Sequence, residues 1–330
     1  MSQFYKPYND EWMICTLCQH YCKIKEGKTG ICGVNKNVGD KIECLVYGYP
    51  SALAIDPIEK KPLYHFLPNS QSFSLGTVGC NFHCPFCQNW SISQTSNIDK
   101  RRYFSPEEIV ALAREHRCAS IAYTYNEPTI FYPYARDIAL EAQKYRIQNV
   151  FVTDGYESME VIEDMVGIID AVNVDLKAFD ATYYQKSLGG NLQKVLDNLK
   201  LFIAKGIWVE MTTLIVPTKN DSDEELSRIA NFIAQALGVH VPWHISAFHP
   251  DYKEQDTPRT SLDTLERAYR IGKEAGLNYV YMGNAGVENP TVCPACETTL
   301  IERQYYRVRA NHLVDGCCPS CGYHLEGIFS

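Results

Sequence analysis

The chain has 330 residues, 45% of them hydrophobic and 21% charged, so it can bury the core of an ordinary globular protein. A net charge of −8 excludes a uniformly basic nucleic-acid-binding surface. No apolar run approaches the ~20 residues needed to cross a bilayer, and residues 1–7 lack an apolar signal segment. We therefore expect a cytoplasmic protein without membrane contact.

Fourteen cysteines are unusual for such a chain. Because the cytosol keeps thiols reduced, clustered cysteines there bind metal more often than they form disulfides. We therefore expect two or three metal centres. The clusters are Cys15, Cys18, Cys22, Cys32 and Cys44; then Cys80, Cys84 and Cys87; then Cys293, Cys296, Cys317, Cys318 and Cys321.

The N-terminal cluster lies in residues 1–70, which we predict to be a separate Cys-rich segment. Four of its thiols have spacings that suit either a structural zinc ion, our first choice, or an auxiliary iron–sulfur cluster. His20 could replace one of them. The four are Cys15, Cys18, Cys22 and Cys32.

Residues 71–288 alternate between strand-like and helix-like segments, which indicates a parallel β/α sheet. Six or seven units are too few for a closed eight-stranded barrel, so we predict an α/β fold of the partial (β/α)6 TIM-barrel type. A doubly wound sheet is the second choice. The predicted strands are Ser72–Val78, Ser120–Thr124, Asn149–Thr153, Ala171–Leu176, Trp208–Leu214, Trp243–Phe248 and Tyr279–Met282.

The central cysteines form a Cys-x3-Cys-x2-Cys motif directly after the first predicted barrel strand. That position is the carboxyl-end rim, where β/α enzymes carry their chemistry. Three thiolates from one loop, Cys80, Cys84 and Cys87, can hold a [4Fe–4S] cluster and leave one iron open for a reactant. The alternative is a zinc site completed by His83, for which the spacing is poor.

The C-terminal residues 289–330 contain two Cys-x2-Cys knuckles, typical of a zinc ribbon. We predict a structural Zn²⁺ held by Cys293, Cys296, Cys318 and Cys321; Cys317 is the less well-spaced competitor. Arg303, Arg307 and Arg309 alternate with tyrosines between the knuckles. This stretch could touch RNA, but we expect a solvated hairpin.

The central motif, with Phe86 before its last cysteine, resembles the signature of the radical S-adenosylmethionine (SAM) superfamily. The resemblance implies that the open iron binds SAM and that the reduced cluster cleaves it. The products would be methionine and a 5′-deoxyadenosyl radical, which abstracts hydrogen from a substrate. It also implies an electron donor of the flavodoxin or ferredoxin type.

Further segments resemble the activating enzymes of glycyl-radical enzymes. Tyr125-Asn126-Glu127-Pro128 stands where those proteins carry Gly-Gly-Glu-Pro, which implies that Glu127 and the backbone of Tyr125 and Asn126 hold the SAM ammonium. Thr153 and Asp154 are similar to part of an Asp-Thr-Asn-Gly segment of the activases, which implies that they bind the cofactor. Val152 replaces the first Asp of that segment, which helps to build a monovalent-cation site in the activases.

Two later strand ends complete this set. Asp175-Leu176-Lys177 matches Asp-Leu-Lys, with Lys177 predicted to bind the SAM carboxylate or the substrate and Asp175 to orient Lys177 or hold ribose. His249 corresponds to a ribose-contacting histidine. A plain ion pair and a loop histidine are the alternative interpretations.

The order of motifs over nearly the whole chain resembles the AmmeMemoRadiSam system radical SAM enzymes, related to pyruvate formate-lyase activating enzyme. This implies association with Memo-like and AMMECR-domain proteins. We predict a radical SAM enzyme acting on a small molecule. The alternatives are an activase acting on the backbone of a glycyl-radical enzyme, and a zinc-ribbon protein that binds nucleic acid.

Overall fold

The structure is a computed structural model that describes residues 4–329. Within that range the central feature is an eight-stranded sheet in the order β13-β12-β11-β10-β9-β8-β7-β6. Its strands are β6 (Ala52–Pro57), β7 (Gln71–Gly76), β8 (Ser120–Tyr123), β9 (Gln148–Thr153), β10 (Ala171–Asp175), β11 (Trp208–Ile215), β12 (Trp243–Ala247) and β13 (Val280–Gly283).

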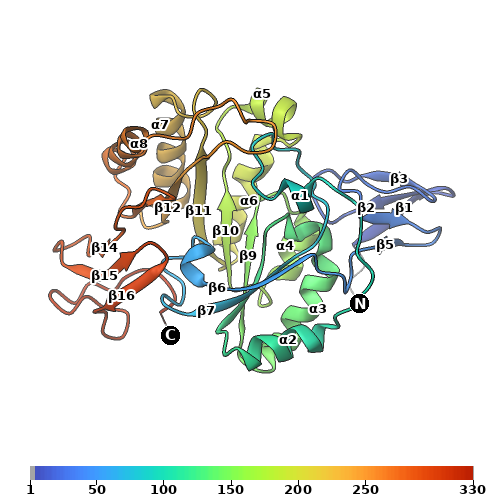
Figure 1. Ribbon diagram of the computed structural model, residues 1–330, viewed down its shortest axis with the longest axis horizontal. Coiled ribbons are helices and arrows are strands. Elements are labelled where there is room, and N and C mark those ends of the chain that lie inside the picture. The colour runs from blue at the N-terminus through green and yellow to red at the C-terminus, as the bar shows by residue number, and fades with distance from the viewer. Residues whose placement is uncertain (1–3, 330) are drawn as a thin grey trace.

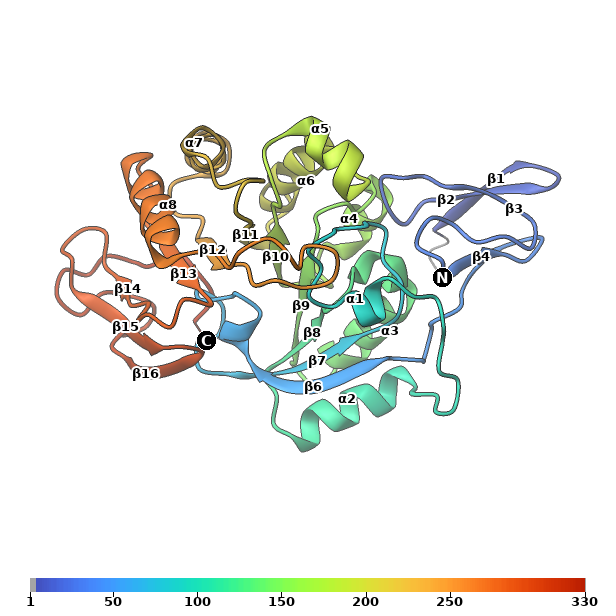
Figure 2. The ribbon, with the colours of Figure 1, turned by 45° about the horizontal axis from the view of Figure 1, so that its top comes forward.

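Strands β7 to β13 run parallel and pair in chain order, and β6 adds antiparallel to β7 at one edge. A doubly wound sheet would reverse its strand order at a switch point, so that alternative is wrong. The predicted partial barrel is confirmed, and Figure 2 shows the curvature of the sheet. Strand β6 was not predicted, and it lies within residues 1–70, which we assigned to the Cys-rich segment. Because β6 belongs to the barrel sheet, a domain boundary before β6 fits the structure better than one at residue 70.

Helices connect the parallel strands and cover the sheet from outside (Figure 1). The start of α2 follows the sequence closely: the Ser105 hydroxyl accepts from the Glu108 N–H, and the Glu108 carboxylate accepts from the Ser105 N–H. The main helices are α1 (Trp90–Ser93), α2 (Pro106–Glu115), α3 (Tyr132–Gln143), α4 (Met159–Met165), α5 (Ala181–Tyr183), α6 (Leu192–Ala204), α7 (Asp223–Phe232) and α8 (Leu262–Glu274). Four 3-10 or π-helical turns are η1 (Ile58–Lys60), η2 (Pro128–Phe131), η3 (Tyr184–Leu188) and η4 (Ile233–Leu237).

The amino ends of the barrel strands are filled by the segment that links η1 to β7. The backbone N–H groups of Tyr64 and His65 donate to the two Glu210 carboxylate oxygens at 2.9 and 2.7 Å. His244 lies 2.7 Å from the same carboxylate. A fully buried carboxylate is tolerated here because each of its oxygens has a donor. The amino ends of the barrel strands are therefore closed by buried side chains. Only the rim formed by the carboxyl ends of the strands can hold an active site.

The two Cys-rich ends of the chain lie on opposite sides of the sheet (Figures 1 and 2). The N-terminal part forms the antiparallel strands β1 (Tyr5–Asn9), β2 (Trp12–Cys15) and β3 (Lys23–Lys25) and the pair β4 (Asn35–Asn37) and β5 (Ile42–Cys44). The C-terminal part forms β14 (Thr291–Val292), β15 (Thr299–Gln304) and β16 (Arg307–Asn311).

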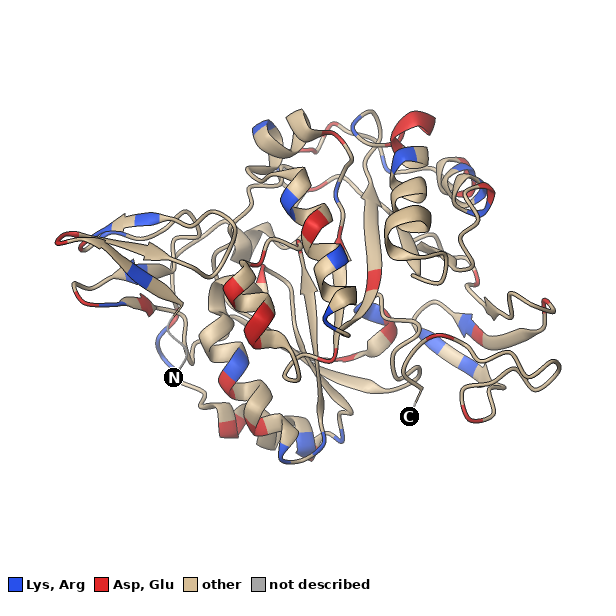
Figure 3. Cartoon of the chain, turned by 180° about the vertical axis from the view of Figure 1, so that it is seen from behind, with Lys and Arg blue, Asp and Glu red and all other residues tan. Residues whose placement is uncertain are grey.

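Basic and acidic residues are intermixed along the chain, and both kinds occur on the same helices (Figure 3). Arg303, which we expected on a solvated hairpin, is buried: its guanidinium donates to the Tyr64 carbonyl at 2.7 Å and to the Thr291 hydroxyl at 2.6 Å. It is thus unavailable to nucleic acid. In residues 4–329, no helix is long and apolar enough to cross a membrane.

Candidate active site

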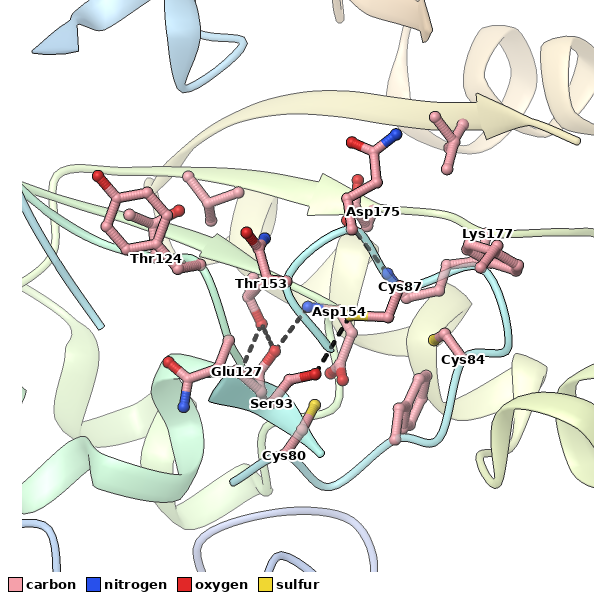
Figure 4. A pocket seen from close by; sticks show the side chains of 18 of the residues that line it. Cys80, Cys84, Cys87, Ser93, Thr124, Glu127, Thr153, Asp154, Asp175 and Lys177 are labelled. Atoms are coloured by element: carbon pink, nitrogen blue, oxygen red, sulfur yellow. Dashed lines mark hydrogen bonds and ion pairs between the residues drawn. The ribbon is translucent and has the colours of Figure 1, made fainter. Parts of the chain in front are cut away.

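A cavity of about 240 Å³ opens at the carboxyl ends of the barrel strands, and the three central cysteines line one side of it (Figure 4). The loop that carries them follows β7. Gly79 has a φ of +88°, and a Cβ atom there would come within 2.6 Å of the Cys32 carbonyl oxygen, so this turn requires glycine. The sequence thus brings Cys80, Cys84 and Cys87 to one cavity, as predicted from their spacing.

Two of these thiols, Cys80 and Cys84, are held in surroundings that favour their neutral form. Burial raises the pKa of Cys84 to about 12 and also raises the pKa of Cys80, where the nearby Asp154 carboxylate adds to the effect. A metal that replaces the thiol proton removes this penalty. His83 is exposed, and in the described chain it forms no compact metal-ligand group with these cysteines, which argues against the zinc alternative.

Two carboxylates, Glu127 and Asp154, line the cavity beside Cys80 (Figure 4). The Glu127 carboxylate accepts the Asp154 N–H at 2.7 Å, and Thr153 Oγ1 lies 2.9 Å from it. The Oδ2 atom of Asp154 is buried and has no hydrogen-bond partner within residues 4–329. Burial and the neighbouring Glu127 carboxylate raise the pKa of Asp154. Such a pair calls for a cation between or beside them.

A third carboxylate lies behind this pair. Glu157 is buried outside the cavity, and Thr153 Oγ1 lies 2.6 Å from its Oε1 atom. Burial and the proximity of Glu127 raise the pKa of Glu157 to about 8, so it carries a proton at neutral pH. Glu157 thus lies behind the two carboxyl groups that face the cavity, Glu127 and Asp154.

The Tyr125–Asn126 stretch keeps a glycine-like backbone without glycine. Tyr125 has a φ of +74°, a conformation that costs a non-glycine residue of order 1 kcal/mol or more. Its hydroxyl donates to Asp56 Oδ2 at 2.9 Å, and its ring lies 4.7 Å from the buried Lys61 ammonium. These contacts hold the residue in the strained conformation, which explains how this chain departs from Gly-Gly.

The side chain of Asn126 forms hydrogen bonds to the backbone at the start of the cysteine loop. Its amide oxygen accepts the Thr77 N–H at 3.1 Å, and its amide nitrogen donates to the Gly79 carbonyl at 2.8 Å. The side chain therefore pins the start of the loop that carries Cys80. A role in holding SAM is left to its backbone.

Lys177 and Asp175 face the cavity from the end of β10 (Figure 4). Their charged groups lie 3.1 Å apart, and the Lys177 side chain is only 13% exposed. Burial opposes the charge on Lys177, but Asp175, Cys84 and Asp154 outweigh it and raise its pKa. The cavity thus presents a fixed positive charge opposite two carboxylates.

His249 is exposed and does not line the cavity; its ring contacts the carbonyl of the adjacent Pro250 at 3.4 Å. The geometry therefore does not support the predicted contact with ribose. The wall at this side is made by small polar residues that sequence reasoning missed. They are Thr212, Ser246 and Asn284, at or near the ends of β11, β12 and β13.

The loop after β12 closes over the cysteine loop. Trp90 stacks on Tyr252 with ring centroids 5.4 Å apart, and its indole N–H donates to Asp251 at 3.0 Å. The Lys253 N–H donates to the Pro85 carbonyl at 3.0 Å. Two loops far apart in sequence are thereby joined next to Gln88 and Asn89, which line the cavity.

The C-terminal knuckles form a compact ligand group. The sulfur atoms of the four predicted ligands lie within 4.8 Å of one another: Cys293, Cys296, Cys318 and Cys321. Cys317 is outside the group and donates instead to the Asp315 carbonyl. Hydrogen bonding with Thr298 lowers the pKa of Cys296 to about 6, which favours the metal-binding thiolate.

Comparison with known proteins identifies the family and the fold. The family described as "Radical SAM superfamily" matches residues 74–233. "Uncharacterized protein MJ0808" of Methanocaldococcus jannaschii is 41% identical over 330 residues, covering 98% of each chain. "Pyruvate formate-lyase 1-activating enzyme" of Escherichia coli is 22% identical over 60% of this chain and 87% of that one.

A solved structure shares the fold. The radical SAM methyltransferase from Sphaerobacter thermophilus superposes with a TM-score of 0.51 at 16% identity, covering 67% of this chain and 68% of that one. The chain belongs to the radical SAM superfamily and is similar to the activating enzymes of pyruvate formate-lyase. It is an enzyme whose family uses SAM, a [4Fe–4S] cluster and an electron donor.

The cavity fits those groups. Three thiols from one loop suit a cluster with one open iron. SAM carries an ammonium, a sulfonium and a carboxylate, and the cavity offers two carboxylates on one side and a lysine on the other. The unpartnered Asp154 oxygen in particular needs a positive group.

Proposed function

We propose that the chain binds SAM across Glu127, Asp154 and Lys177, above a [4Fe–4S] cluster held by Cys80, Cys84 and Cys87, and uses it to oxidise a small-molecule substrate. When bound, the reduced cluster supplies the electron that cleaves the SAM sulfonium. The observation that carries this proposal is that all six side chains line one cavity.

The chain's own residues would orient SAM. Glu127 and Asp154 would accept hydrogen bonds from its ammonium, and charge-assisted bonds of this kind fix position as well as adding affinity. Lys177, held by Asp175 at 3.1 Å, would bind the SAM carboxylate or an anionic group of the substrate. Holding the reacting carbon close to the hydrogen it removes lowers the barrier by orientation.

The loops joined beside the cavity favour a small substrate. The contacts of Trp90 with Tyr252 and Asp251 join two loops over one side of the cavity, which restricts access for a folded protein. A second cavity, of about 320 Å³, shares Asn284 with the first and is lined by Arg259 and Tyr306. It offers room for a substrate with an anionic or aromatic part.

The second candidate is activation of a glycyl-radical enzyme. It is supported by relatives named as activating enzymes, among them the pyruvate formate-lyase activating enzyme of Escherichia coli.

The proposal of a radical SAM enzyme that acts on a small molecule includes association with Memo-like and AMMECR-domain proteins. The C-terminal tetrad is proposed to hold Zn²⁺ in a structural role, because four close thiolates leave no open position.

The test is SAM cleavage by anaerobically reconstituted, reduced protein, measured as 5′-deoxyadenosine. A dialysable extract of the source cells should stimulate cleavage if the substrate is small. Stimulation by the retained protein fraction alone, with an organic radical signal appearing on a protein, would instead support the activase.

A further inference from the structure

Four N-terminal thiols surround a small cavity of their own, away from the barrel mouth. It is lined by Cys15, Cys18, Cys22 and Cys32 together with His20, Asn35 and Asn81. Cys44, the fifth thiol of this region, does not line it. Residues far apart in the loops of a small sheet thus converge on one point, as expected for ligands of a single metal centre.

The spacing of these thiols differs from that of the C-terminal tetrad. A tetrahedral zinc ion with Zn–S bonds near 2.3 Å brings its sulfurs to about 3.8 Å from one another. Within residues 4–329 only the C-terminal tetrad forms a group whose ligand atoms all lie within 4.8 Å. The N-terminal thiols form no such group, with or without His20, and neither do Cys80, Cys84 and Cys87.

We infer that Cys15, Cys18, Cys22 and Cys32 bind an iron–sulfur cluster of the [4Fe–4S] type, in addition to the one proposed at the barrel rim. A cuboidal cluster binds each thiolate through a different iron, so its ligands stand farther apart than those of one ion. The amide of Asn35 donates to Cys32 Sγ at 3.4 Å. Hydrogen bonds to ligand sulfur stabilise the reduced cluster.

This site lies directly against the loop that carries Cys80. The His20 ring donates to the Asn81 carbonyl at 3.0 Å, and Asn81 is the residue after Cys80. The Cys32 carbonyl packs on Gly79. The knuckle around Cys18 is bonded to the loop after β9, through the Gln19 N–H and the Tyr156 carbonyl at 2.9 Å.

The position suits a relay of single electrons. Ile31, which also lines this cavity, is 51% exposed, so the site reaches the surface on one side and the Cys80 loop on the other. An external one-electron donor of the flavodoxin or ferredoxin type would be oxidised there. The electron would pass to the rim cluster without proton transfer. This relay rests on the proposed function, whereas the presence of the cluster does not.

Metal analysis separates the two cluster sites. In a Cys80→Ala/Cys84→Ala/Cys87→Ala variant reconstituted anaerobically, we expect about four irons and four sulfides per chain to remain, half the wild-type content. Adding Cys22→Ala should remove most of this iron, whereas adding Cys44→Ala should not. An iron-free triple variant carrying one zinc more than the C-terminal tetrad accounts for would overturn the inference.

Electron paramagnetic resonance tests the proximity. Two reduced clusters in contact relax each other, so the rim signal of wild type should saturate at higher microwave power than that of Cys22→Ala. Equal saturation would refute the relay. If wild type holds both clusters but forms no 5′-deoxyadenosine, the proposed function fails and the second cluster stands.

Discussion

The backbone N–H of Asp154 donates to Oε2 of Glu127 at 2.7 Å, so the ends of β8 and β9 share one carboxylate. The same carboxylate accepts the Thr129 N–H at 2.9 Å at the start of η2. Glu127 therefore braces the rim as well as facing the cavity. Variants at this position have to keep its shape in order to test its charge.

Glu127→Gln removes the charge and keeps one acceptor oxygen. We expect SAM binding to weaken by roughly 1.5–3 kcal/mol, the worth of a hydrogen bond to a charged group. Iron content should be unchanged. Isothermal titration with SAM measures the effect, and Glu157→Gln is the matched control because Glu157 is already protonated near neutral pH. Wild-type affinity in Glu127→Gln would show that the ammonium binds elsewhere.

Replacing any one of Cys80, Cys84 and Cys87 by Ala should abolish 5′-deoxyadenosine formation, because a cluster held by two thiolates is lost or inactive. Cys118→Ala is the control, since Cys118 is buried outside the cavity. The product is quantified after anaerobic reduction with SAM. Sustained cleavage in the triple variant would contradict the radical mechanism.

Lys177→Ala should uncouple SAM cleavage from substrate oxidation. The lysine lies opposite the carboxylates, so its loss should leave some basal cleavage but remove the stimulation by substrate-containing extract, because geometry at the reacting carbon is lost. Asp175→Asn should show the same change more weakly. Full stimulation in Lys177→Ala would exclude this role.

The C-terminal tetrad should retain one zinc ion per chain after mild cluster stripping. Cys318→Ser should lose about one equivalent, since the tetrad then lacks a ligand. Cys317→Ser is the neighbouring control and should retain it, because Cys317 lies outside the group. An unchanged zinc content in Cys318→Ser would mean that the knuckles form no site.

Acid should weaken the closed end of the barrel. Burial lowers the pKa of His65 from 6.5 to about 4, because it outweighs the Glu210 carboxylate and the hydrogen bond with the Glu326 carbonyl, which both raise the pKa. The unfolded chain binds a proton first, so stability is full above pH 6.5 and falls as the pH drops towards 4, by on the order of 3 kcal/mol. Thermal melts across this range should show a smaller loss in His65→Gln. An equal loss in both would assign the effect to other groups.

The barrel could be predicted because its strands are short apolar runs separated by well-capped helices. Strand β6 escaped prediction because its residues alternate between exposed and half-buried, as at a sheet edge. The cysteine motif located the cavity, but Ser246 and Asn284 are single polar residues that carry no pattern. His249 shows the converse: a matching position in sequence does not fix the direction of a side chain in a loop.

The burial of Arg303 was likewise invisible in sequence, because its partners are distant. Tyr64 and Glu59 precede it by more than 200 residues, and both are buried with it. Spacing between cysteines, by contrast, predicted the C-terminal group, since its ligands lie in two short knuckles. Patterns within a short stretch of sequence could thus be predicted, whereas contacts between residues far apart in the sequence could not.

The C-terminal segment that carries the cysteine tetrad packs on the barrel. Cys293 and Cys318 are buried in the same apolar cluster as Tyr64, Tyr279 and Tyr281, and the Ile328 N–H donates to the His65 carbonyl at 2.8 Å. Free energy gained when the tetrad binds its ion is therefore shared with the catalytic sheet. We therefore expect a chelator that removes this ion to lower the stability of the barrel sheet as well as that of the C-terminal segment.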